Sequence, residues 1–293
     1  MSQQITTAMV EQYNANVQLL SQQKGSRLRG AVRVEMINGK NAFFDQIGAT
    51  AAQLKETRHM DTPQTDTPHA RRRVSLADYV WADFVDREDL VRTLIDPTSP
   101  YAVNAVNAFG RTMDDVIIAA LGGIAYTGVA GGTATTLASY LSSRQLIADD
   151  NTGLTLAKLL QIKKIFWDND VDEDIELHIA CSSQQIVDLL GEEELTSGDY
   201  QTVKALVEGK VNQALGFTFH RSQRLSVDAS DIRTCYAWAQ DGLLLGIGAD
   251  IQTRISERAD KNYLTQVWCG MSIGATRMEE AKVVQFMADE SPD

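Results

Sequence analysis

The sequence PYAVNAVNAFGRTMDDVIIAAL, residues 100–121, carries the strongest secondary-structure signal in the chain. Ser99 suits the N-cap and Pro100 the first helical position, while Gly122-Gly123 predicts a left-handed stop. A helix of about 22 residues forms a rod of about 33 Å. Phe109 and Val116 share one face, which we expect to be buried. Apolar residues recur at spacings of three and four, the period of an amphipathic helix: Val103, Val106, Phe109, Met113, Val116, Ile117, Ala120 and Leu121.

A polar segment upstream of this helix predicts a long exposed loop. Residues 55–70, KETRHMDTPQTDTPHA, contain almost no apolar residue and two prolines, so they cannot bury a core of their own. The pattern predicts an extended hairpin with two partly apolar arms, and a loop of this length usually has a function. Further upstream, the alternation over residues 31–37 predicts a strand. The apolar residues of the arms are Phe43, Phe44 and Ile47 before the loop, and Val74, Leu76, Tyr79, Val80 and Trp81 after it.

Downstream of the helix, helical and strand patterns are mixed. The apolar residues from Leu156 to Phe166 predict a helix with Lys158, Lys163 and Lys164 toward solvent. Strands are predicted at 176–180 and 217–220, and Ser182 is predicted to cap a helix over 184–190. Residues 236–248 are apolar, but their pattern does not distinguish a helix from a strand. Alternation from Val267 to Ile273 predicts a strand, and a second strand is expected over 282–287 after Gly274-Ala275.

Composition and charge limit the classes of function. The 293 residues hold 27 Lys and Arg against 39 Asp and Glu, a net charge of -12, which disfavours a sequence-specific nucleic-acid binder. The scattered Cys181, Cys235 and Cys269 indicate reduced thiols and a cytoplasmic fold. No targeting signal is visible. Residues 116–143 lack charge but are interrupted by glycines, so a buried helix end is expected rather than a membrane span.

No residue pattern predicts catalysis, a cofactor or a metal. The chain lacks the serine-hydrolase, phosphate-loop and zinc-protease motifs. His178 and Cys181 lie three apart in a predicted strand and point to opposite faces. Residues 168–174 resemble the start of a calcium loop, but Glu173 stands where glycine is needed and Ile179 where an acid is needed. A solvated acidic turn is the preferred interpretation, and the chain is predicted not to be an enzyme.

The order of these elements resembles that of the major capsid proteins of tailed double-stranded-DNA bacteriophages. The resemblance covers nearly the whole chain, and its motifs are structural. The predicted rod resembles the family's spine helix, and the polar hairpin resembles its extended loop. Four further segments are similar to family sequences: FGRTMDDVIIAALGGIAYTGVAGG (109–132), LTLAKLLQIKKIFWDNDVD (154–172), LVEGKVNQALGFTFHRSQRL (206–225) and VWCGMSIGATRMEEAKVVQF (267–286).

The resemblance implies an α+β fold of the Hong Kong 97-like type. Its expected parts are an N-terminal arm (1–44), an extended loop hairpin with the start of the peripheral domain (45–98), and the peripheral domain with its spine helix (99–150). An axial domain (151–265) and strands returning to the peripheral domain (266–293) follow. No cross-linking residue pair is carried over from the family.

The resemblance also implies a function and partners. Copies of the chain are expected to assemble into pentamers and hexamers that form an icosahedral head around the genome. The expected partners are other copies of itself, a portal protein, scaffolding and decoration proteins, and packaged DNA through non-specific contact, with no cofactor and no membrane. Assembly is expected in the host cytoplasm and residence in the virion. An encapsulin-like bacterial compartment shell and an unrecognised soluble α/β enzyme remain open alternatives.

Charged clusters suggest contacts between subunits. Arg71, Arg72 and Arg73 form one basic cluster after the loop, and acidic residues occur at Asp83, Asp86 and Asp89 and over 168–174. In an isolated subunit we expect these charges to be unpaired. In a ring, the arginines of one copy are expected to pair with carboxylates of the next. A solvated charge run is the equally weighted alternative.

Overall fold

The computed structural model describes residues 21–58, 61–62, 64–85, 98–191 and 213–291. The chain divides into two compact units. The first unit contains residues 1–26, 78–112 and 249–272, and the second contains 27–77, 113–248 and 273–293. Asp86 and Asp89, two of the predicted contact residues, lie outside the described residues.

The predicted long helix is confirmed as α2 (Thr98–Gly122). It begins before Ser99, so this residue lies in the first turn instead of capping it. Phe109 is buried as predicted, whereas Val116 is only partly buried. The predicted left-handed stop is wrong, because neither Gly122 nor Gly123 has a positive φ. The structure gives Gly122 a different reason to be glycine, since a Cβ there would collide with the Tyr236 hydroxyl.

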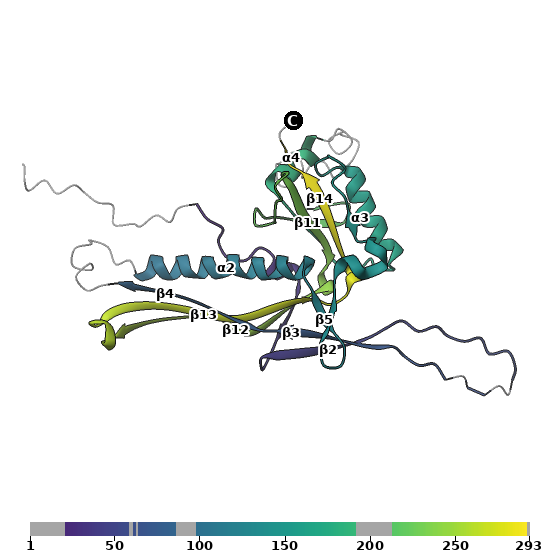
Figure 1. The fold of residues 1–293 in the computed structure, drawn as a ribbon, viewed down its shortest axis with the longest axis horizontal. Coiled ribbons are helices and arrows are strands. Elements are labelled where there is room, and N and C mark those ends of the chain that lie inside the picture. The colour runs from purple at the N-terminus through teal and green to yellow at the C-terminus, as the bar shows by residue number, and fades with distance from the viewer. Residues whose placement is uncertain (1–20, 59–60, 63, 86–97, 192–212, 292–293) are drawn as a thin grey trace, which may run out of the picture. The chain divides into compact units, whose positions relative to one another are not determined.

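The first unit contains most of β4 (Ala77–Val85) and parts of two long strands, β12 (Leu243–Arg258) and β13 (Leu264–Arg277). β4 is the edge strand of a four-stranded sheet with the order β1-β12-β13-β4. β12 and β13 are joined through the short helix η5 (Ala259–Lys261), and they are the two long yellow-green ribbons in Figure 1. Across this turn, the Arg258 guanidinium donates hydrogen bonds to Asp260 and Gln266. The sequence pattern suggested a break at Gly274, but β13 runs unbroken through it.

A six-stranded sheet forms the larger core of the second unit. Its order is β7-β14-β11-β8-β10-β9. The pattern of the apolar stretch 236–248 did not distinguish a helix from a strand. In the structure this stretch forms the end of β11, the short helix η4 (Gln240–Gly242) and the start of β12. β8 is buried along its whole length. The strands are β7 (Leu146–Ile147), β8 (Leu177–Cys181), β9 (Gln213–Ala214), β10 (Phe217–Arg221), β11 (Ile232–Ala239) and β14 (Val283–Asp289).

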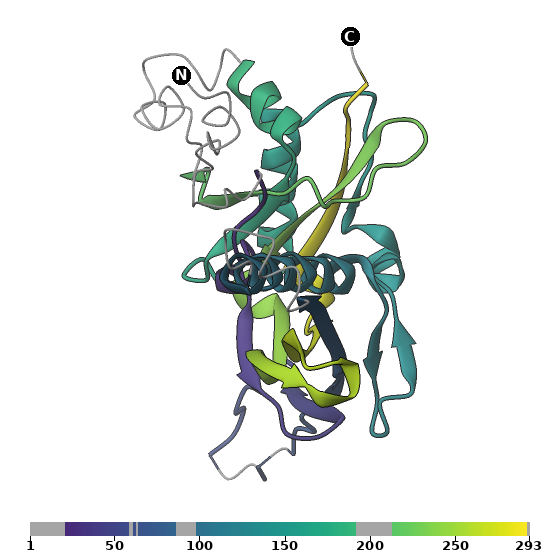
Figure 2. The ribbon, with the colours of Figure 1, turned by 90° about the vertical axis from the view of Figure 1, so that its left-hand side faces the viewer.

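Two helices pack beside this sheet. α3 (Leu156–Asp168) stands alongside β11 and β14 in both ribbon views (Figures 1 and 2). α4 (Ser183–Gly191) follows β8, and the Ser182 hydroxyl accepts a hydrogen bond from the backbone N–H of Gln185, which confirms the predicted N-cap. The buried face of α3 includes Leu159, Ile162 and Phe166.

Lys158 contradicts the prediction that it points to solvent. Its side chain is buried, and its ammonium donates to the carbonyl oxygens of Asp149, Thr152, Gly153 and Met287 at 2.6–3.2 Å. The ammonium therefore ties α3 to β14 and to the loop that precedes the helix. Helical periodicity could not reveal this, because most of the acceptors are loop carbonyls rather than side chains.

The predicted hairpin is confirmed and belongs to a third sheet. β2 (Asn41–Ile47) pairs antiparallel with β3 (His69–Ser75), and β5 (Ala125–Thr127) and β6 (Thr133–Thr135) extend the sheet. Between β2 and β3, the described residues have no regular secondary structure and project away from these strands (Figure 1). The projecting segment (residues 48–68) thus begins and ends at one firmly paired strand pair.

The predicted early strand is confirmed as β1 (Arg33–Met36), which pairs in parallel with β12. It follows the short helix η2 (Arg29–Ala31). A small apolar cluster of Ile37, Val74, Leu244 and Met278 lies under the hairpin strands, with Phe44 and Leu76 packed against it. Two further short helices, η3 (Leu137–Ser143) and η6 (Glu280–Lys282), complete the second unit.

Candidate assembly site at the root of the extended loop

The strands β2 and β3 hold the projecting segment at its root. Seven residue pairs join them, from Asn41 with Ser75 to Ile47 with His69. Beside the root lies a hollow of about 700 Å³ whose lining includes Ile47, Val129 and the paired Asp45 and Arg71. Ile47 and Val129 are 71% and 87% exposed. Large apolar side chains this exposed beside a projecting segment are typical of a surface that another chain covers.

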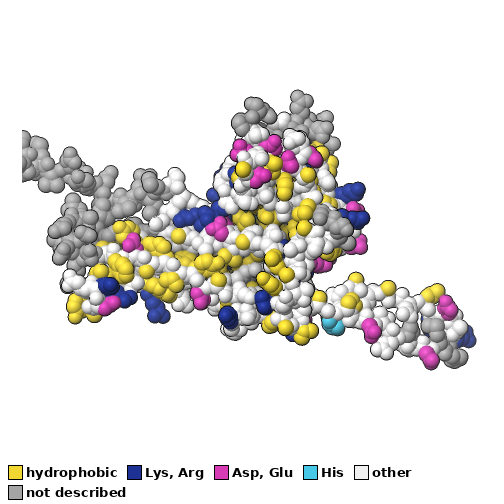
Figure 3. Space-filling view, viewed as in Figure 1, with side chains coloured by type: hydrophobic (Ala, Val, Ile, Leu, Met, Phe, Trp, Pro, Cys, Tyr) yellow, Lys and Arg dark blue, Asp and Glu magenta, His cyan; other side chains and the backbone are white. Residues whose placement is uncertain are grey.

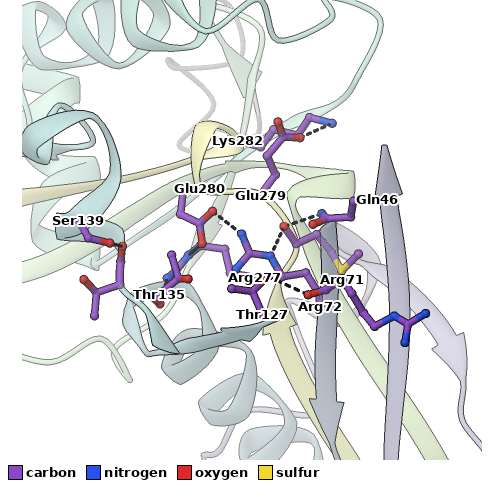
Figure 4. A network of polar contacts seen from close by, with 12 residues as sticks. Gln46, Arg71, Arg72, Thr127, Thr135, Ser139, Arg277, Glu279, Glu280 and Lys282 are labelled. Carbon is purple, nitrogen blue, oxygen red and sulfur yellow. Dashed lines mark hydrogen bonds and ion pairs between the residues drawn. The ribbon is translucent and has the colours of Figure 1, made fainter. Parts of the chain in front are cut away.

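A buried ionic network anchors β3 (Figure 4). The Arg72 guanidinium donates to the carbonyl oxygen of Met278 at 2.9 Å and to the Glu280 carboxylate at 2.5 Å. The side-chain amide of Gln46, on β2, donates to the same Met278 carbonyl at 2.7 Å. Both strands of the root are therefore bonded to the chain segment that links β13 to β14.

Arg277 joins this network to the end of α2. Its guanidinium donates to the carbonyl oxygens of Leu121 and Gly123 at 2.7 and 2.9 Å, and to that of Thr135 at 3.3 Å. The carbonyls of Leu121 and Gly123 lie at the end of α2, where a helix leaves carbonyls without intrahelical partners, and a cation there interacts favourably with the helix dipole. Glu280 lies 3.6 Å from the Arg277 Nε. Burial lowers the pKa of Arg277, but an arginine stays charged under these conditions.

The three consecutive arginines have different surroundings. Arg71 is partly exposed, pairs with Asp45 at 2.6 Å and lowers the pKa of that carboxyl through its hydrogen bond. Arg72 is buried in the network, and Arg73 lies over the Tyr126 ring at 4.6 Å. The expectation that these charges are unpaired within a subunit is therefore wrong for Arg71 and Arg72. Alternate residues of a strand face opposite sides of the sheet. Arg72 is the one that turns inward.

The predicted role of these charges between subunits stays a prediction. Arg71 remains available for it, because its pair with Asp45 is solvent-exposed and so weakly held. Asp83, on β4, is only partly buried, and its carboxylate accepts a hydrogen bond from the backbone N–H of Phe84. Arg72 is unsuited to a contact between subunits, since its guanidinium already bonds to Met278 and Glu280 inside the second unit.

Two buried cysteines of the described residues are unreactive. Burial raises the pKa of the Cys181 thiol to about 12 and raises that of Cys235 as well, so both stay protonated and are poor nucleophiles. Within the described residues, no three His, Cys, Asp or Glu side chains gather as a metal would require. No helix in the same part of the chain is long and apolar enough to cross a membrane.

Sequence reasoning missed Arg277 and Glu280. They lie in the segment TRMEEAK, residues 276–282, which has the composition of a surface turn. Their partner Arg72 is more than 200 residues away in sequence. The available signal was the interruption of an apolar alternation by an arginine at the end of a buried strand, since buried charges are rarely found without partners.

Comparison with known proteins gives this architecture a family. A family model described as phage capsid protein matches residues 5–290. The chain belongs to the phage capsid protein family. It is a structural protein, a major capsid subunit of an icosahedral shell, which confirms the prediction that it is not an enzyme. The family match also favours the phage head over a bacterial compartment shell. No curated protein matches the chain.

Solved capsid structures have the same fold as this capsid protein. The capsid of cyanophage P-SCSP1u matches with a TM-score of 0.75 and 17% identity, over 98% of this chain and 95% of that chain. The capsid of cyanophage Pam1 matches with a TM-score of 0.72 and 13% identity, over 98% of both chains. The capsid of Ralstonia phage GP4 matches with a TM-score of 0.72 and 12% identity, over 97% of both chains. These matches confirm the predicted α+β, Hong Kong 97-like fold.

Proposed function

We propose that this capsid subunit closes its shell by laying residues 48–68 of one copy on a neighbouring copy within pentamers and hexamers around double-stranded DNA. One observation carries the proposal: the segment has no core of its own, yet its root is bonded to a buried ionic network. A projecting segment that has no core of its own but is held firmly at its root is suited to contact another subunit. Such a head-to-tail contact, repeated around an axis, closes a ring.

Exposed apolar side chains support self-association. Figure 3 shows hydrophobic side chains gathered over α2 and the strands beside it. In the second unit, Leu160 and Trp167 of α3 are each about half exposed and lie seven residues apart on one helix face. Contiguous apolar surface is characteristic of proteins that associate. On the strand β4, Val80 and Phe84 are also exposed and point to one side of the sheet.

The role of a capsid subunit also suggests partners other than copies of the chain itself. A head filled with DNA needs an entry vertex, so a portal protein is a proposed partner, as are scaffolding and decoration proteins. Assembly is proposed to take place in the cytoplasm of the host bacterium. The net charge of -12 limits tight attraction to phosphates, which suits non-specific contact with packaged DNA.

Particle formation tests the proposed function. The full chain, expressed alone or with the phage's scaffolding protein, is expected to form closed particles in negative-stain micrographs. Deleting residues 50–66, which leaves β2 and β3 intact, is expected to give folded subunits that form no closed shell. Shells of normal size and yield from this deletion variant would exclude the segment as the contact between neighbours.

Proteolysis provides an independent prediction for the same segment. Trypsin is expected to cut unassembled subunits first after Lys55 or Arg58, because both lie in an exposed stretch without regular structure. In assembled shells a neighbouring copy should cover these bonds and slow cleavage by at least about tenfold. Cleavage at Arg258, which lies outside the segment at the end of β12, serves as the internal reference. Equal rates at Lys55 in subunits and shells would contradict the proposed contact.

A further inference from the structure

A buried histidine and a partly buried one face each other across neighbouring strands of the six-stranded sheet. His178 lies on β8 and His220 on β10, which run parallel. The Nδ1 of His178 and the Nε2 of His220 are 3.2 Å apart, and the ring centroids are 5.2 Å apart. The Trp238 ring, on β11, lies 6.0 and 6.3 Å from the two imidazoles. The cluster therefore spans three strands in the interior of the sheet.

The contact between the imidazoles requires at least one unprotonated ring. A neutral imidazole has one nitrogen that donates and one that accepts. The bond at 3.2 Å uses a donor from one ring and a lone pair from the other. When both rings are protonated, two N–H donors and two positive charges face each other, so the bond is lost. His178 is only 3% exposed, and its Nε2 makes no hydrogen bond within the described residues.

The groups around His178 and His220 do little to stabilise a positive charge on the two imidazole rings. The Glu176 carboxylate lies 3.9 Å from the His178 Nε2, but its side chain is 72% exposed to water. The Asp114 carboxylate on α2 favours protonation of His220, yet it already accepts the backbone N–H groups of Arg27 and Leu28. Burial, together with the charge of the other ring, lowers the pKa of His178 to about 4. Burial also lowers the pKa of His220.

We propose that the His178–His220 pair is an acid-sensitive latch, which holds β10 and the edge strand β9 on the sheet while neutral and releases them when both rings are protonated. β10 bonds to β8 on one side and to the two-residue β9 on the other. The seam between β8 and β10 therefore holds this edge on the sheet, and Phe217 of β10 also packs against Phe166 of α3. The inference concerns the folded subunit and does not depend on how the shell closes.

The direction of the pH effect follows from the lowered pKa values. A freed histidine binds its proton near pH 6.5, whereas His178 in the closed sheet binds it near pH 4. The closed state is thus favoured fully above about pH 6.5 and loses that advantage as pH falls through about 4. Between these limits, each pH unit should raise the opening equilibrium constant about tenfold for each proton bound on opening.

Hydrogen exchange of the full-length, unassembled subunit tests the latch. After correction for the pH dependence of chemical exchange, protection of the 217–221 amides should fall at least about 30-fold from pH 7.5 to pH 4.5. Protection of the 283–289 amides of β14, at the other side of the sheet, should fall much less. An equal fall in both strands would indicate general acid unfolding and would overturn the latch.

Matched variants identify the residues responsible. His178→Asn places an amide where Nδ1 lies, and His220→Gln places one where Nε2 lies, so each keeps a polar neighbour that cannot titrate. Each should weaken the pH dependence of β10 protection, because one of the two titrating rings is removed, whereas His69→Asn, at an exposed histidine, should leave it unchanged. If either variant does not fold, the histidine ring NMR signals of the wild-type subunit decide. Titration of His178 and His220 well below the ordinary histidine pKa of about 6.5 supports the latch, and titration of both near pH 6.5 overturns it.

Discussion

Glu280→Ala is expected to lower the free energy of unfolding by about 3–5 kcal/mol, because removal of one partner leaves buried charges without compensation. The Glu280 side chain contacts both Arg72 and Arg277, and all three residues are buried. Arg277 remains fixed by main-chain carbonyls, so neither guanidinium can turn out to water without breaking the root of the loop. Urea unfolding of unassembled subunits at pH 7.5, followed by circular dichroism, measures the loss.

Glu279→Ala is the matched control for this prediction. The neighbouring Glu279 side chain is half exposed and lies 3.3 Å from the Lys282 ammonium. An exposed pair of this kind contributes at most about 1 kcal/mol. Equal losses from the two variants would show that the buried network adds nothing beyond ordinary surface charge pairing.

Trp238→Ala is expected to cost about 3–5 kcal/mol through lost burial and the cavity left behind. Trp238 is fully buried on β11 and donates its indole N–H to the Ala31 carbonyl oxygen at 2.8 Å. The side chain therefore both fills the core and fixes the short helix η2. Urea unfolding of the variant subunit at pH 7.5 measures the effect, and this pH keeps the histidine pair neutral.

Trp238→Phe separates the two contributions. It keeps most of the buried apolar area but leaves the Ala31 carbonyl without its donor, which should cost about 1–3 kcal/mol. The Phe variant should thus be clearly more stable than the Ala variant. If the two variants unfolded at the same urea concentration, the filling of the core would not be what Trp238 contributes.

Much of the architecture could be predicted from local patterns. The three- and four-residue spacing over 100–121 predicted α2 to within two residues at the start, because an amphipathic helix must keep one face apolar. The coreless polar stretch between two apolar arms predicted the hairpin of β2 and β3. Both signals lie within a short window of the chain. The family resemblance rests on the order of such local segments along the chain, and it does not depend on the contacts between them.

The candidate site could be predicted only in outline. The run of three arginines drew attention to β3, but all three had to be treated alike, since nothing in RRR distinguishes its members. The pleat of the strand and its pairing with β2 and β5 decide that Arg71 faces water and Arg72 faces Glu280. Asp83 was identified by its charge alone, and its partner within the subunit is a backbone N–H.

The sequence by itself therefore determined the elements, their order and the absence of recognisable catalytic motifs, because these depend on residue type and spacing over a few turns or strands. Only the tertiary structure decided which charges are buried and what Gly122 accommodates. Lys158 and Arg277 are surrounded by main-chain carbonyls, an environment that no side-chain pattern records. Gly122 is fixed by the Tyr236 hydroxyl from another element. The physical reason is that the burial of a charge depends on the folded path of the chain. Arg72 and Arg277 meet partners from over a hundred residues away, whereas Lys158 meets mainly the carbonyls of a nearby loop that folding turns toward it.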